Sequence, residues 1–236
     1  MTLLTNDYMS HMKQRFVELL QGMGVVPAGA NPIVTKTFLR MRELLVVDAN
    51  SYEFVMREIS GNDKPLEHKL NDNEYFLPTH VSIKLRKGDS DDAGAKQDGN
   101  FKQFSYPDPA EFVGANGAIK EACALELVYD GKLDIESDGT AITKDLMTSL
   151  TRSEIANETA DLEEKGFSRL DNEFVYSGRG DNKVRLRLGA GKNALIDGSV
   201  DAAGAAVTTR NYVEIEVLGF VYSKATQDTA GVCALS

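Results

Sequence analysis

Apolar and polar residues alternate with a period of two in several separate runs of this chain, and this pattern sets its fold class. In residues 81–86, Val81, Ile83 and Leu85 share one face of a strand. The opposite face, which is predicted to meet solvent, carries Ser82, Lys84 and Arg86. Other strand-like runs are 33–47, 52–59, 122–129, 174–176, 184–188, 194–196 and 211–222. Turns rich in Gly, Asp and Asn separate these runs without any strand–helix alternation, so we predict an all-β fold.

Residues 106–139 form the most distinctive stretch. It opens with a turn governed by Pro107 and Pro109 and continues into two apolar runs that are joined by Asp130 and Gly131. Asp-Gly between alternating segments is a strong hairpin signal, because glycine accepts the positive φ of a primed turn. The stretch has no pattern typical of a catalytic site. It predicts a closely packed corner of a β-sheet protein.

A helix is predicted near the N-terminus, from about residue 5 to residue 22. Its apolar residues recur at steps of three and four: Tyr8, Met12, Phe16, Leu19, Leu20 and Met23. Suitable caps are Thr5, Asn6 or Asp7 at its start and Gly22 or Gly24 at its end. One interpretation is a helix that covers an edge or end of a sheet. The other is an arm that docks on a neighbouring subunit or on lipid, although the basic residues that favour lipid are few.

Three further local predictions concern the middle of the chain. Pro78 marks the start of the 81–86 strand or an edge position, because proline cannot donate to a sheet ladder. Residues 144–150 are compatible with a short helix. The polar, Glu-rich residues 153–165 suggest a long excursion or a connection between two halves.

Length, net charge and cysteine content limit the classes of protein to which the chain can belong. The 236 residues are enough for one large β-domain or two compact ones, and the net charge of −10 argues against a surface that binds nucleic acid. No signal peptide or membrane-spanning run is present, so we expect synthesis in the cytoplasm. Cys123 lies in an apolar run and is interpreted as a core residue, whereas Cys233 in a polar tail is interpreted as a free thiol. A bridge between the two is the less favoured alternative.

The patterns expected of metal sites are incomplete. The only histidines are His11, His68 and His80, which form no His-x-His pair, and His68 and His80 are interpreted as surface or half-buried side chains. An acidic, glycine-rich loop that begins at Asp89 lacks the EF-hand order, because Asn100 stands where a bidentate Glu is needed. We therefore predict no metal ligands and no cofactor.

Patterns expected of phosphate binding and of catalysis are also incomplete. Residues 189–192 (GAGK) lack the earlier glycine and the Ser or Thr of a phosphate loop, and are interpreted as a turn. Residues 179–181 spell Arg-Gly-Asp, which also suits a hairpin turn. No Gly-x-Ser-x-Gly elbow occurs, and neither cysteine has a recognisable local partner. We predict no catalytic or cofactor-binding residues, and hence not an enzyme.

The order of features resembles a major capsid protein of tailless icosahedral bacteriophages, of the jelly-roll kind whose shell surrounds an internal lipid membrane. The segments that carry the resemblance cover the middle third of the chain and its last strand, and none of their motifs carries chemistry. They are residues 71–77 (NDNEYFL), 106–109 (YPDP), 112–116 (FVGAN), 125–133 (LELVYDGKL) and 212–222.

The resemblance implies a virion protein that assembles with itself as homotrimeric capsomers into a shell, beside other virion proteins. Its N-terminal helix would face the inner membrane or neighbouring subunits, and sequence-specific binding of nucleic acid is not expected. The resemblance favours a double jelly roll over a single β-sandwich, although about ten predicted strands fall short of the roughly sixteen that two jelly rolls need. The corresponding division is a helical arm at 1–26, a first β half at 27–139, and a connection with a second β half at 140–236.

Two other classes remain open as alternatives. A β-sandwich binding module, such as an adhesin or a carbohydrate-binding protein, would need an aromatic platform, but the chain has no Trp and only 8% aromatic residues. An enzyme built on a jelly roll would need the metal-ligand spacing that the histidines lack.

Overall fold

In the computed structural model, the described residues are 2–46, 49–58, 67–89, 102–104, 128, 130–151, 166–171, 173–188 and 209–224. Both cysteines lie outside them, as do the predicted strand 194–196, the polar segment 153–165, the turn 189–192 and nearly all of 106–129. The described part is mostly β-structure with one long N-terminal helix, which confirms the predicted all-β class.

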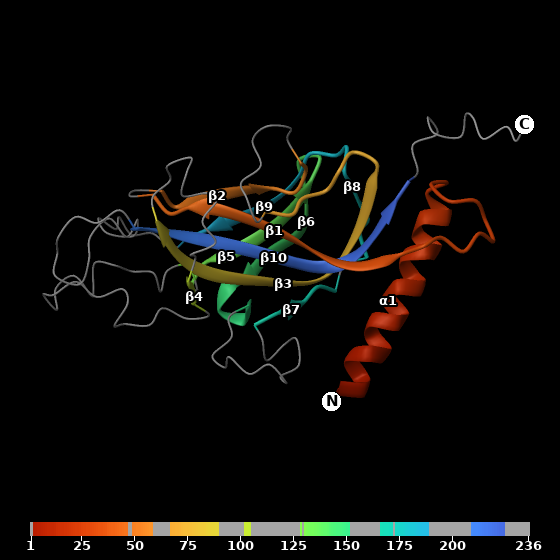
Figure 1. Ribbon diagram of the computed structural model, residues 1–236, viewed down its shortest axis with the longest axis horizontal. Coiled ribbons are helices and arrows are strands. Elements are labelled where there is room, and N and C mark those ends of the chain that lie inside the picture. Colours follow the sequence, from red (N-terminus) through yellow and green to blue (C-terminus); the bar gives the residue numbers. More distant parts are fainter. Residues whose placement is uncertain are drawn as a thin grey trace, which may run out of the picture.

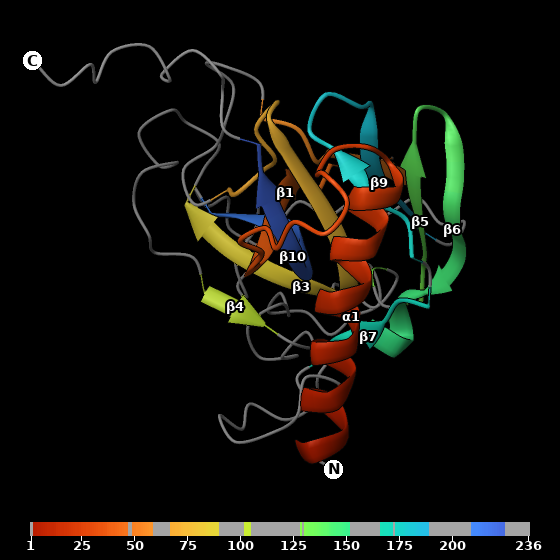
Figure 2. The same ribbon diagram turned by 90° about the vertical axis from the view of Figure 1, so that its right-hand side faces the viewer.

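The strands form two antiparallel sheets (Figures 1 and 2). Sheet A has the order β1-β10-β3-β4, and β7 and β8 also pair with β3. Its strands are β1 (Thr35–Leu44), β3 (Glu74–Asp89), β4 (Lys102–Phe104), β7 (Ser168–Arg169), β8 (Tyr176–Ser177) and β10 (Thr209–Ser223). Sheet B has the order β2-β9-β5-β6. Its strands are β2 (Ser51–Val55), β5 (Lys132–Ser137), β6 (Thr140–Met147) and β9 (Asn182–Arg187).

The two sheets pack face to face around one apolar core. Alternate residues of the long strands of sheet A point inward, such as Met41 on β1, Ile83 on β3 and Ile215 on β10. Phe54, Ile135 and Val184 meet them from sheet B. The alternation predicted for residues 81–86 and 211–222 is therefore confirmed on its apolar side. Two sheets do not confirm the double jelly roll, and strands from residues 27–139 and 140–236 lie side by side in both sheets.

The hairpin predicted at Asp130 and Gly131 is wrong in position. β5 begins at Lys132, but both of its edges are already occupied, by β6 on one side and β9 on the other. The hairpin turn lies one Asp-Gly pair later, at Asp138 and Gly139, whose φ angles of 48° and 77° are those of a primed two-residue turn. Val128, a described residue of the predicted 122–129 strand, is buried in the core.

We expect Gly139→Ala to destabilise the protein by about 1–2 kcal/mol, because an L-residue with a side chain is strained at positive φ. No atom lies within 4 Å of the added Cβ, so the cost comes from the backbone alone. Gly139→Asn is the matched control, since asparagine tolerates this conformation and should recover much of the loss. Urea unfolding of the three proteins measures the difference, and equal stability of all three would contradict the turn assignment.

Two more predictions need correction. Residues 144–150 do not form a helix: β6 runs through Thr140–Met147, and only the short 3₁₀ turn η2 (Thr148–Thr151) follows. β5 offers β6 a hydrogen-bonded ladder, which outweighs the helical propensity of a short segment. Pro78 lies inside β3, opposite Gly219 and next to a β-bulge of β3 at Thr79. On its other side β8 pairs with Tyr75–Phe76 and β7 with His80–Val81, so no described strand requires a donor from Pro78.

The helix α1 (Thr2–Gly22) lies against one end of sheet A (Figure 2). It begins three residues earlier than predicted, so Thr5, Asn6 and Asp7 lie within it and do not cap it. Its predicted end at Gly22 is confirmed. Within the described residues, no helix has the length and apolarity needed to cross a membrane.

Candidate functional site

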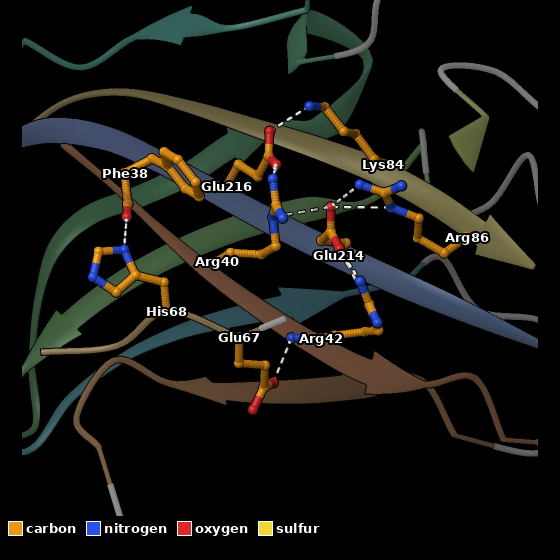
Figure 3. Close-up of polar contacts among 9 residues, drawn as sticks. All are labelled: Phe38, Arg40, Arg42, Glu67, His68, Lys84, Arg86, Glu214 and Glu216. Atoms are coloured by element: carbon orange, nitrogen blue, oxygen red, sulfur yellow. Dashed lines mark hydrogen bonds and ion pairs between the residues drawn. The ribbon is translucent and has the colours of Figure 1, made fainter. Parts of the chain in front are cut away.

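The most unusual feature of the molecule is a set of buried charges on the outer face of sheet A, the face turned away from the core. Glu214 and Glu216 project from the central strand β10 toward basic side chains on the two strands beside it (Figure 3). We call this set the sheet A charge ladder. It consists of Glu214, Glu216, Arg40, Arg42, Lys84 and Arg86.

Each carboxylate of the ladder joins β1 to β3 through β10. Glu214 accepts from Arg42 Nη2 at 2.6 Å and from Arg86 Nη2 at 2.7 Å, with Arg40 Nε at 3.7 Å. Glu216 accepts from Arg40 Nη2 at 2.7 Å and also from the Lys84 ammonium. Because side chains on a strand change face at every residue, a slip of one residue in the pairing of β10 would remove all of these contacts. The ladder therefore fixes the register of three strands.

Burial makes the ladder energetically important. The Glu214 side chain is 0% exposed and that of Arg42 is 5% exposed. Burial opposes ionisation of Glu216, but Lys84 and Arg40 outweigh it and hold the pKa of this carboxyl below its ordinary value. The polar side of residues 81–86 was predicted to meet solvent, and this is wrong. Ser82 is 1% exposed and Lys84 turns toward Glu216, because β10 supplies carboxylates that compensate the cations.

The outer edge of β1 is covered by a short crossing segment that contains Glu67 and His68 (Figure 3). His68 and Arg40 exchange two backbone hydrogen bonds, at 2.8 and 2.9 Å, while His68 Nδ1 lies 2.6 Å from the Phe38 carbonyl oxygen. Glu67 accepts from the backbone N–H of Arg42 at 2.8 Å. These contacts occupy the polar groups that an edge strand would otherwise offer to a foreign strand.

Sheet B carries a second charge ladder on its outer face, with the signs exchanged. Here the cations are on the inner strand β9 and the carboxylates on its neighbours. Arg185 contacts Glu53 of β2 at 2.9 Å and Glu136 of β5 at 3.0 Å, and Arg187 contacts Asp134 at 2.8 Å. This ladder is more exposed: the Glu53 side chain is 50% exposed and that of Arg187 is 40% exposed.

The predicted apolar stripe of the N-terminal helix is buried within the same chain. Met12, Phe16 and Leu20 pack against Leu77 of β3 and Phe220 of β10 in a cluster separate from the core between the sheets. Tyr8 and Leu19 are partly buried there, while Met23 is 52% exposed. This confirms the interpretation that the helix covers one end of a sheet.

His80 lies beneath the helix and is buried, with 2% of its surface exposed. The sequence-based interpretation of a surface or half-buried side chain is wrong for this residue, because Tyr8 of α1 covers it with its ring centroid 5.7 Å away. Burial and the nearby Arg169 and Lys36 lower the pKa of His80 to about 4.

The described residues bring no metal-ligand group together: they contain no cluster of three or more His, Cys, Asp or Glu side chains. His11 is on the exposed side of α1, His68 at the β1 edge and His80 beneath α1. The Arg179-Gly180-Asp181 tripeptide lies in the turn between β8 and β9, which confirms the predicted turn, but these strands belong to different sheets and do not form a hairpin. Residues 90–100 of the acidic, glycine-rich loop and residues 106–127 of the predicted packed corner lie outside the described residues.

Comparison with known proteins adds no family to these observations, because no family model, curated protein or solved structure matches the chain.

Proposed function

We propose that this chain is a virion structural protein, most simply the major capsid protein of an icosahedral shell, and that its fold is a single jelly roll. The observation that carries the proposal is a nested order of strand pairing. β1 pairs with β10, β2 with β9, β3 with β7 and β8, and β5 with β6. The chain is thus paired like one long hairpin.

The rolled form of that hairpin follows from two further pairings. β10 also pairs with β3, and β9 also pairs with β5, so that the hairpin closes on itself into two packed sheets. A long hairpin rolled in this way is a jelly roll, which is found in viral capsid proteins, in lectins and in cupins. A single jelly roll uses all the described strands of sheet B and leaves only β4 of sheet A as an addition.

Among the functions that this fold supports, the contents of the interior favour a structural one. Cupin-type enzymes place metal ligands between the sheets, whereas here that space is filled by apolar side chains from both sheets, including Phe54, Met56 and Tyr176. The buried and half-buried charged side chains lie on the outer faces of the sheets, in two charge ladders that fix the strand register. A shell subunit must keep one conformation while its surfaces contact neighbouring subunits. Ion pairs between strands favour a single conformation because they fix the strand register.

Assembly of the purified full chain tests the proposal. We expect electron microscopy and light scattering to show homotrimers or larger closed particles whose mass rises with protein concentration. Ile33 is 87% exposed in the isolated chain, so Ile33→Asp is expected to weaken association if the connector after α1 contributes to contacts. Asn31→Asp, at an exposed polar position of the same connector, is the matched control.

A chain that remains monomeric at high concentration, binds no other virion component and binds a specific glycan would contradict the proposal. That result would favour a lectin-like binding module on the same fold.

A further inference from the structure

The imidazole of His80 is enclosed at the contact between α1 and sheet A. Tyr8 of α1 lies edge-on to it, and Nδ1 is 3.0 Å from the hydroxyl oxygen of Thr79. Tyr8 is itself fixed from two sides, because its hydroxyl donates to the Leu170 carbonyl at 3.3 Å and the Arg169 guanidinium lies 3.7 Å from the centre of its ring. A neutral ring fits this setting.

The charged groups that act on His80 are cations. Arg169 of β7 is paired with His80 across the sheet, and Lys36 of β1 approaches from the other side. Two acidic residues of this region are each paired with a cation: Asp171 contacts Arg169 at 3.4 Å, and Glu173 contacts Arg15 of α1 at 2.7 Å. A proton on His80 would therefore place a positive charge in a buried site that lies near the cations Arg169 and Lys36.

The helix α1, which covers His80, is packed so that it can separate from the two sheets. Its apolar stripe packs in its own cluster, apart from the core between the sheets. It is joined to β1 by a connector that contains two glycines at positive φ, Gly24 and Gly29. Loss of the helix would leave the core between sheets A and B intact, so its docking can change without global unfolding.

We propose that α1 is an acid-releasable arm, and that protonation of His80 is what releases it. Protonation is favoured when the helix has left, because water then reaches the imidazole, and it is disfavoured when Tyr8 covers the ring. Acid therefore pulls the equilibrium toward the undocked arm, and the apolar stripe of α1 becomes available to another surface. This inference does not depend on the capsid proposal.

The sign and size follow from linkage. For the uncovered ring we take the ordinary histidine pKa of 6.5, and in the docked state the pKa of His80 is about 4. Docking is thus at full strength above about pH 6.5, weakens roughly tenfold per pH unit below it, and levels off near pH 4. Between about pH 8 and about pH 5 the docking constant should fall roughly 30-fold.

Hydrogen exchange of the full chain, followed by mass spectrometry over this pH range and corrected for intrinsic exchange rates, tests the proposal. We expect protection in α1 to fall roughly 30-fold while protection in β10 stays constant. His80→Phe keeps an aromatic ring against Tyr8 but cannot be protonated, so protection of its α1 should not change with pH. Glu173→Gln is the matched control at the same interface and should behave like the parent protein.

Three outcomes would overturn the proposal. His80→Phe could lose α1 protection in acid as strongly as the parent protein, Glu173→Gln could abolish the pH dependence, or α1 and β10 could lose protection together. An NMR titration of the histidines in the unsubstituted chain is the second measurement, and it does not require any variant to fold. We expect the pKa of His80 to lie well below the ordinary 6.5 of histidine, and a midpoint near 6.5 would also overturn the proposal.

Discussion

Glu214→Ala should destabilise the protein by about 3–5 kcal/mol, which is a large part of the total stability of a typical domain. The Glu214 side chain is 0% exposed, and it accepts hydrogen bonds from Arg42 and Arg86 on opposite sides of β10. Alanine would leave these guanidinium groups next to each other in a site that water barely reaches. The cost is therefore mainly that of uncompensated buried charge. Urea unfolding, with the midpoint and slope both fitted, measures it.

Sheet B offers the matched control for this prediction. Glu53 also accepts from a cross-strand arginine, Arg185, at 2.9 Å, but its side chain is 50% exposed. Water and salt screen this pair, so Glu53→Ala should cost less than about 1 kcal/mol. Both substitutions remove a carboxylate that is paired with cross-strand cations, but Glu214 is fully buried on the central strand β10, whereas Glu53 is half exposed on the edge strand β2. Equal losses would show that Glu214 is not buried as the structure has it.

The charge ladders also show which features of the fold could be predicted from the sequence and which could not. Alternation in residues 81–86 and 211–222 correctly predicted two strands and the face that meets the core. The prediction that the other face meets solvent was wrong, because it considered each strand without the charged residues of its neighbours. Arg40-x-Arg42, Lys84-x-Arg86 and Glu214-x-Glu216 share one spacing. Matching spacings of opposite charge were the signal for a cross-strand ladder, but strand order was needed to see it.

Short sequence motifs predicted the correct type of element but not its position in the chain. The Asp-Gly rule predicted a hairpin, and the chain has one, but at Asp138–Gly139 and not at Asp130–Gly131. The two copies are equally good turns by sequence. The choice between them depends on which strands take the two edges of β5, which is a matter of tertiary pairing. Burial of His80 likewise depends on where α1 docks, and the periodicity of α1 does not specify its partner surface.

The interior position of Pro78 leads to the second large prediction, at Gly219. These two residues face each other across β3 and β10, where the register shifts between Leu218 and Gly219. At this point the backbone of Gly219 lies close to Phe76 and Leu77 of β3. A Cβ on Gly219 would overlap the Leu77 carbonyl oxygen and would lie 2.7 Å from Cζ of the Phe76 ring. Glycine is therefore required here by close approach of the two strands.

Gly219→Ala is expected to cost at least about 3 kcal/mol, at or above the usual range for overpacking, because a backbone oxygen and a buried ring must both move. The Phe76 ring is 0% exposed and Leu77 packs under α1, so neither has free space to occupy. Gly22→Ala is the control: its added Cβ meets nothing within 4 Å, and it should leave stability nearly unchanged. Thermal and urea unfolding of both variants measure the difference. If Gly219→Ala were as stable as the Gly22→Ala control, the close approach of Gly219 to Phe76 and Leu77 of β3 would be contradicted.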